Sequence, residues 1–253
     1  MPAGMRRLAL VAGLALLVPG TATAVVHAPR PSGASAKKWG ASLYAANCER
    51  CHGPSGVGEA PKGPNGGPSL RGVGALAPDF YLRTGYMPLS SVGLQPHSQR
   101  VEFSQPEIDA LVAYVASLGP GPPVPKPQPE RGSVAQGFQL FTQHCAGCHQ
   151  VVAQGGYVKG AVVPPLGGVT STEIAEAVRV GPYLMPRFSP KAISNAQLDS
   201  IVAYVRYTQH PDNAGGWSIG LIGPVPEGLV AWLIAGVALV GVCVVIGERL
   251  RRE

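Results

Sequence analysis

The pentapeptide Cys-Glu-Arg-Cys-His at residues 48–52 recurs as Cys-Ala-Gly-Cys-His at residues 145–149, ninety-seven residues later. Each copy is followed by a Met-Pro pair, Met87-Pro88 in the first half of the chain and Met185-Pro186 in the second. These methionines come 35 and 36 residues after the histidines of their own copies. The chain therefore contains an internal duplication, built on one sulfur-rich motif and one distant methionine.

The pattern C-x-x-C-H is typical of covalent attachment of a c-type haem. The two thiols bond to the haem vinyl groups, the adjacent histidine ligates the iron from one side, and a methionine can supply the second axial ligand. The sequence therefore predicts two covalent haem c groups. Four thiols attach them, from Cys48, Cys51, Cys145 and Cys148, and four axial ligands hold the irons, from His52, Met87, His149 and Met185.

Two other interpretations of C-x-x-C are less consistent with this chain. A redox dithiol of the thioredoxin kind belongs beside a βαβ pattern, which the sequence does not show. A zinc site would need the four thiols to converge, whereas here the two pairs lie in separate, similar halves. Neither interpretation predicts a histidine directly after the second cysteine in both copies.

Composition limits the remaining possibilities. With 253 residues, the chain is long enough for two small domains. Half of the net charge of +6 arises at the two ends, because residues 31–226 hold 14 Lys or Arg against 11 Asp or Glu, a surplus of only +3. A nucleic-acid-binding protein needs a dense basic face. We therefore expect no nucleic-acid partner.

Two apolar segments flank the middle of the chain. Residues 1–24 combine a basic start, a short apolar run and Ala22-Thr23-Ala24, which indicates a signal peptide or a retained N-terminal anchor. Leu229 to Gly247 is a run of nineteen residues without a charge, close to the length that spans a bilayer. Arginines follow this run, so the positive-inside rule places residues 248–253 in the cytoplasm and the haem domains outside the membrane.

The two halves share more than the haem motif. A Gly and an aromatic residue precede the first cysteine by eight and four residues in both, which predicts a short helix leading into each attachment site. Apolar residues recur at helical spacing over 107–115 and 197–205, and Ser104 with Glu107 and Ser194 with Gln197 form capping boxes before these helices.

We therefore expect an all-α protein of two tandem domains and a C-terminal transmembrane helix. The segments are a signal peptide or anchor (1–24), a first domain (36–118), a Pro-rich linker (119–132), a second domain (133–210), a juxtamembrane loop (211–227), a membrane helix (228–247) and a cytoplasmic tail (248–253).

Each half resembles a class I cytochrome c. The Gly and aromatic residues before each cysteine pair, the helices at 107–115 and 197–205, and Met185-Pro186-Arg187-Phe188 carry this resemblance, which Met87-Pro88-Leu89-Ser90 follows less well. The resemblance implies that the carbonyls of Pro68 and Pro164 accept hydrogen bonds from His52 and His149. Such contacts orient a metal ligand and tune its metal.

The whole arrangement resembles the dihaem cytochrome c subunit of the actinobacterial cytochrome bcc complex, a menaquinol-oxidising respiratory complex. The resemblance implies a cytochrome b subunit, a Rieske iron–sulfur subunit and cytochrome c oxidase as partners, with electrons passing from the Rieske protein to the oxidase. Three alternatives stay open, namely a dihaem peroxidase, a sulfur-compound dehydrogenase and a dihaem subunit of another terminal oxidase. The predicted methionine ligands argue against the two enzymes, which need an open or unusually ligated haem.

Overall fold

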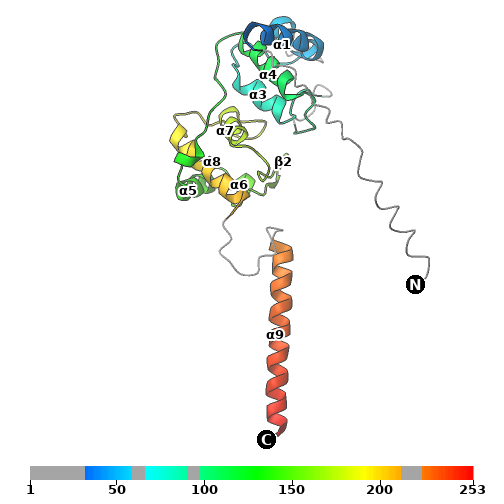
Figure 1. Cartoon of the computed structure of the whole chain (residues 1–253), viewed down its shortest axis with the longest axis vertical. Helices are drawn as coiled ribbons and strands as arrows, with labels where there is room; N and C mark the ends of the chain where they lie inside the picture. The colour runs from blue at the N-terminus through cyan, green and yellow to red at the C-terminus, as the bar shows by residue number, and fades with distance from the viewer. Residues whose placement is uncertain (1–31, 59–65, 90–96, 212–223, 253) are drawn as a thin grey trace, which may run out of the picture. The chain divides into compact units, whose positions relative to one another are not determined.

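A computed structural model describes residues 32–58, 66–89, 97–211 and 224–252. The described residues are mostly helical (Figure 1), as the sequence predicts. The chain divides into two compact units. The first comprises residues 1–125 with 176–187, and the second comprises 126–175 with 188–253. The predicted signal peptide or anchor at residues 1–24 lies outside the described residues.

The first unit is built on two helices that pack face to face. Its elements are α1 (Gly33–Asn47), α2 (Glu49–His52), the short 3₁₀ helix η1 (Pro54–Gly56), α3 (Leu76–Arg83) and α4 (Gln105–Ala116). Helix α1 packs against α4 (Figure 1). Gly40 permits this approach, because a Cβ atom there would lie 2.0 Å from the Ala110 carbonyl oxygen. The buried core consists of Tyr44, Leu82, Ile108, Leu111 and Val115.

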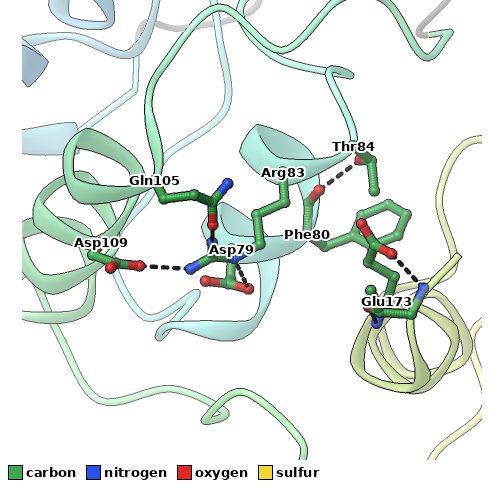
Figure 2. A network of polar contacts seen from close by, with 8 residues as sticks. Asp79, Phe80, Arg83, Thr84, Gln105, Asp109 and Glu173 are labelled. Atoms are coloured by element: carbon green, nitrogen blue, oxygen red, sulfur yellow. Dashed lines mark hydrogen bonds and ion pairs between the residues drawn. The ribbon is translucent and has the colours of Figure 1, made fainter. Parts of the chain in front are cut away.

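Polar contacts of Arg83 join α3 to α4. Figure 2 shows its guanidinium between the carboxylates of Asp79, at 2.8 Å, and Asp109, at 2.7 Å, with a further bond to the Gln105 side chain. Asp79 is buried, whereas Asp109 is exposed. The hydrogen bond to Asp79 is the main reason that the pKa of Arg83 lies above its ordinary value. The guanidinium therefore neutralises a buried carboxylate and links the two helices.

The second unit repeats the helix pair. Its elements are η2 (Pro129–Arg131), α5 (Val134–His144), α6 (Ala146–His149), the strands β1 (Gly156–Val158) and β2 (Ala161–Val163), and α8 (Asn195–Gln209), while α7 (Ser171–Val180) contributes residues to both units. Helix α5 packs against α8. Gly137 is the counterpart of Gly40, since a Cβ atom there would lie 1.9 Å from the Ser200 carbonyl oxygen.

A small β-hairpin departs from the purely helical expectation. Strands β1 and β2 pair antiparallel, with Tyr157 opposite Val162. The turn between them contains Gly160 at φ +88°, a backbone conformation that favours glycine. The hairpin is too short to alter the helical class, and the helical pattern of the sequence contains no signal for it.

Both predicted capping boxes are present. The Glu107 side chain accepts from the Ser104 backbone N–H at 2.8 Å, and the Gln197 side chain accepts from that of Ser194 at 2.8 Å. These bonds satisfy backbone donors that a helix start otherwise leaves without a partner. They set the beginnings of α4 and α8 at the residues where the sequence predicts them.

The C-terminal helix α9 (Pro224–Arg252) follows α8 in the sequence. Its residues Gly228–Arg252 are long and apolar enough to cross a membrane, and their large side chains are exposed. A helix with apolar side chains on every side needs lipid or a partner to cover it. The predicted C-terminal membrane helix is therefore present as a candidate span.

Candidate haem-attachment sites

Each C-x-x-C-H motif forms a single helical turn directly after a longer helix. In the first unit, the Cys48 carbonyl accepts from the N–H groups of Cys51, at 3.1 Å, and His52, at 2.9 Å. In the second unit, the Cys145 carbonyl accepts from Cys148 and His149 at 3.0 and 2.9 Å. The two attachment turns are thus alike in backbone, and each places two thiols and an imidazole on adjacent positions of one turn.

In the second unit Cys145 is buried and Cys148 exposed, whereas Cys48 and Cys51 in the first unit are both partly buried. Burial raises the pKa of Cys48 and of Cys145 to about 11, and the neighbouring thiols of Cys51 and Cys148 add to the shift. The thiolate is the form of cysteine that attacks a disulfide. Burial therefore keeps these two thiols protonated and weakly nucleophilic at neutral pH.

The imidazole of His52 is oriented by its own unit. Its Nδ1 lies 2.8 Å from the Pro68 carbonyl oxygen. A carbonyl can only accept, so this contact selects the tautomer with a proton on Nδ1 and leaves the Nε2 lone pair for a metal. Gly67 lies beside the ring, because a Cβ atom there would approach Nδ1 to 2.9 Å. A glycine is therefore needed next to Pro68 for the ring to hold this position.

Met87 lies in the same hydrophobic cluster as the first attachment site. The side chains of Met87 and Cys48 both pack, partly buried, against the core of the first unit. The Met87 backbone N–H donates to the Tyr81 carbonyl at 3.0 Å. Gly85, at φ +71°, forms the turn before it, where a Cβ atom would lie 2.0 Å from the Gln99 carbonyl oxygen. The methionine is thus held on a tight loop beside the core.

His149 has a different environment from His52. Burial lowers the pKa of His149, and the Pro164 carbonyl opposes that shift. Its Nδ1 is buried, and the distance and angle to Pro164 do not meet those of a regular hydrogen bond. Burial nevertheless keeps the imidazole neutral, which is the form that ligates iron. The contact between Pro164 and His149 is weaker than the resemblance to class I cytochromes implies.

Met185 lies in a turn, where its N–H donates to the Pro182 carbonyl at 2.9 Å. Gly181 forms this turn at φ +65°, and a Cβ atom there would lie 2.6 Å from the Arg187 nitrogen. This segment clusters with the first unit, whereas His149 belongs to the second. The pairing of Met185 with His149 therefore stays a prediction.

Three kinds of residue that shape these sites were not predicted from the sequence. Gly67 makes room for the His52 ring, and Gly85 and Gly181 turn the backbone before each methionine. The shared pattern Arg-x-Gly at 83–85 and 179–181 could have revealed the last two. The hydroxyls of Tyr44 and Tyr204, which bond to the backbone after each histidine, have no comparable sequence signal.

The residues of the first unit fit a covalently attached haem. Two thiols on one turn, an imidazole with its Nε2 left available, and a thioether sulfur in the same apolar cluster form a complete set of haem-attaching and iron-ligating groups. The second unit repeats the thiols and the imidazole. Both turns therefore suit haem c.

Comparisons with known proteins agree with this geometry. The family model described as "Cytochrome C oxidase, cbb3-type, subunit III" matches residues 35–115 and 132–205. The "Cytochrome bc1 complex cytochrome c subunit" of Mycobacterium tuberculosis (strain H37Rv) is 34% identical over 96% of this chain and 88% of its own length. The subunit of the same name from Mycobacterium leprae is 35% identical over 94% and 87%, and that from Corynebacterium diphtheriae is 32% identical over 83% and 80%.

These matches differ in extent. The family model covers only the two stretches that contain the C-x-x-C-H turns, and it is named after subunit III of a cbb3-type oxidase. The mycobacterial relatives align with nearly the whole chain. The whole-chain similarity therefore decides between the two names, and the chain belongs to the family of cytochrome c subunits of the cytochrome bc1 complex.

Proposed function

We propose that this chain carries two haem c groups and relays electrons from a Rieske iron–sulfur protein to cytochrome c oxidase. Electron transfer within a bc complex follows from its family. The further steps are supported by the duplicated attachment turns and by the relatives' near-complete coverage of the chain. A cytochrome b subunit would oxidise the quinol, with menaquinol as the ultimate donor.

The chain's own residues would hold and shield the irons. Haem iron, when bound, takes up and gives away one electron at a time. The thiols of Cys48 and Cys51, and of Cys145 and Cys148, would fix each group to its helical turn, and His52 and His149 would ligate from one side. Met87 and Met185 would supply the second ligand to each iron. A ligand pair of His and Met raises the potential above that of two histidines and leaves no position for peroxide or oxygen.

The membrane helix would keep the carrier beside its partners. Residues 248–253 contain three arginines, which the positive-inside rule retains in the cytoplasm. Both haem domains would then lie on the opposite side of the membrane. The twelve residues 212–223 separate the described part of the second unit from α9 and span at most about 40 Å when fully extended. The second unit would thus stay close to the membrane surface and to membrane-embedded partners.

One observation carries the proposal, namely that the same attachment turn occurs twice in a chain of this family. The pyridine haemochromogen assay on purified wild-type protein should give two haems per chain. The double variants C48S/C51S and C145S/C148S should each give one. A value of one in the wild type, or carbon monoxide binding to a haem of the native protein, would contradict the proposed pair of closed, six-coordinate irons.

The order of the haems can be tested in membranes that contain each double variant. We expect the first unit to face the Rieske donor. The C145S/C148S variant should then let quinol reduce the remaining haem while oxygen uptake stops. In the C48S/C51S variant, the remaining haem should stay oxidised under the same conditions. Purification of the tagged chain in mild detergent without a cytochrome b and a Rieske protein would refute membership of the complex while leaving the haem assignment intact.

A further inference from the structure

Each unit has a tyrosine hydroxyl bonded to the backbone just after the predicted axial histidine. In the first unit, the Tyr44 hydroxyl donates to the carbonyl of Gly53, the residue that follows His52, at 2.7 Å. In the second unit, the Tyr204 hydroxyl donates to the carbonyl of Val151, two residues after His149, at 2.6 Å. Both tyrosines are buried. The two units thus place a phenol at nearly the same point of the chain.

The two phenols come from opposite partners of the helix pair. Tyr44 lies on α1, four residues before the first cysteine, where the second unit has Phe141 on α5. Tyr204 lies on α8, and Tyr114 occupies the same position on α4, seven residues after the capping-box acid or amide. Both units contain an aromatic pair at these positions: the ring centroids lie 5.2 Å apart for Tyr44 and Tyr114, and 5.4 Å apart for Phe141 and Tyr204.

The tyrosine that donates this hydrogen bond therefore lies on a different helix in each unit, although the bond to the backbone is present in both. Side chains that only filled the core could be Phe at either position, because the aromatic ring supplies the packing. A buried hydroxyl has to find an acceptor, and in both units it finds the backbone that leaves the attachment turn. What the units share is the hydrogen bond to this backbone, and not the helix that donates it.

The backbone at this point has a positive φ in both units. Gly53 has φ 71° and ψ 167°, and the corresponding Gln150 has φ 59° and ψ 161°. Glycine adopts this region readily, but a residue with a Cβ atom does so only when its surroundings enforce it. Further bonds close the same loop, since Gly58 N–H donates to the His52 carbonyl at 2.8 Å and Gly155 N–H donates to that of His149 at 3.0 Å. The phenol is one of the contacts that hold the histidine's backbone in place.

We propose that Tyr44 and Tyr204 are positioning residues for the two axial histidines. Each phenol fixes the peptide that follows its histidine, and this peptide sets the direction from which the imidazole approaches the iron. The inference rests on the assignment of His52 and His149 as iron ligands. It predicts that loss of one hydroxyl changes the ligation of the haem in the same unit and leaves the other haem unchanged.

The test uses Y44F and Y204F in the full-length, haem-loaded protein, with Y114F as the matched control. Y114F removes a hydroxyl from the same aromatic pair but leaves the Tyr44 bond in place. Two quantities are measured for each haem, its midpoint potential and the pH at which the far-red methionine–iron absorption band is half lost. A buried hydrogen bond is worth about a tenfold change in a local opening equilibrium. We therefore expect the pH at which this band is half lost to fall by about one unit, and only at the haem of the unit that carries the substitution.

Several outcomes bear on the proposal. The wild type must first show two haems with methionine–iron bands. If Y44F or Y204F then had the same midpoint potentials and the same pH of half-loss as Y114F, the proposal would be overturned. A wild type without these bands would instead refute the proposed ligation. If a Phe variant does not retain its haem, amide hydrogen exchange at Gly58 or Gly155 replaces the spectral measurement, and wild-type exchange rates there would overturn the proposal. Recovery of wild-type behaviour in the double variant F141Y/Y204F would support it.

Discussion

Replacement of Gly137 by alanine should strongly destabilise the second unit. The added Cβ atom would lie 1.9 Å from the Ser200 carbonyl oxygen and 2.7 Å from the Tyr204 Cβ. The first of these neighbours is backbone on the facing helix, so it cannot rotate away. Ordinary contact begins near 3.4 Å, and α5 and α8 would therefore have to separate by about 1.5 Å.

The expected loss of stability follows from two opposing effects. Overpacking of a close contact lowers the free energy of unfolding by roughly 1–3 kcal/mol. At Gly137 the neighbour is a fixed backbone oxygen, so the loss should be at the upper end of this range, ~3 kcal/mol. Alanine is the better helix former by about 1 kcal/mol, which offsets part of the loss. The net effect is a destabilisation of about 2 kcal/mol. For a domain of this size, ~1 kcal/mol shifts the melting temperature by about 4–8 °C, so we expect a fall of about 8–16 °C.

Differential scanning calorimetry of the haem-loaded protein in detergent would measure this fall. Gly168→Ala is the matched control, because no atom lies within 4 Å of its added Cβ and its backbone is not in the left-handed region. Gly40→Ala should lower the stability of the first unit in the same way, given the 2.0 Å distance to the Ala110 carbonyl. If Gly137→Ala and Gly168→Ala melted at the same temperature, the close helix crossing would not limit stability and the reasoning would fail.

Three further perturbations test other parts of the structure. Arg83→Met should lower the free energy of unfolding by about 3 kcal/mol, since it leaves the buried Asp79 carboxylate without its partner. Asp109→Asn should lower it by less than ~1 kcal/mol, because Asp109 is exposed. Urea unfolding of the haem-loaded protein would compare the two variants. Burial raises the pKa of Tyr44 to about 12, so the neutral phenol is favoured in the folded state and stability should fall as pH rises from about 10 to 12; unfolding of Y44F should show a weaker dependence over that range. A chain that ends at Pro211 lacks α9 and should leave the membrane fraction on cell fractionation; its retention there would mean that residues 1–24 or a partner anchor it.

The features that sequence could predict are those that depend on local chemistry. A helix leads into each attachment motif, as expected, and the capping boxes begin α4 and α8 at the expected residues. The bond between His52 and the Pro68 carbonyl also has the expected partners. In each case the necessary groups lie close in sequence, or the resemblance to class I cytochromes specifies them. The iron-ligating roles of the histidines and methionines stay predictions.

The features that sequence could not predict depend on contacts between distant residues. Alignment of the two halves pairs Tyr44 with Phe141, and this pairing suggests that the hydroxyl is dispensable. In the folded units, the hydroxyl that Phe141 lacks is supplied by Tyr204, sixty-three residues away on the facing helix. A comparison of positions cannot find such an exchange, because the acceptor is a backbone carbonyl whose location follows from the packing of both helices.

The Pro-rich segment between the halves shows the same dependence on distant contacts. Residues 119–132 have the composition of an extended spacer. Near its beginning, the Pro122 carbonyl accepts from the Leu76 N–H at 3.1 Å, at the start of α3. Near its end, the Gln128 N–H donates to the Asp199 carboxylate on α8 at 2.8 Å. Asp199 occupies the position of Asp109, which pairs with Arg83 in the first unit.

One helix position thus has two uses, a link between helices in the first unit and an attachment point for the connecting segment in the second. Gly132 adds to this attachment, because a Cβ atom there would lie 2.5 Å from the Asp199 carbonyl oxygen. Each end of the connecting segment is therefore part of the unit beside it, and the freely jointed length is shorter than its composition suggests.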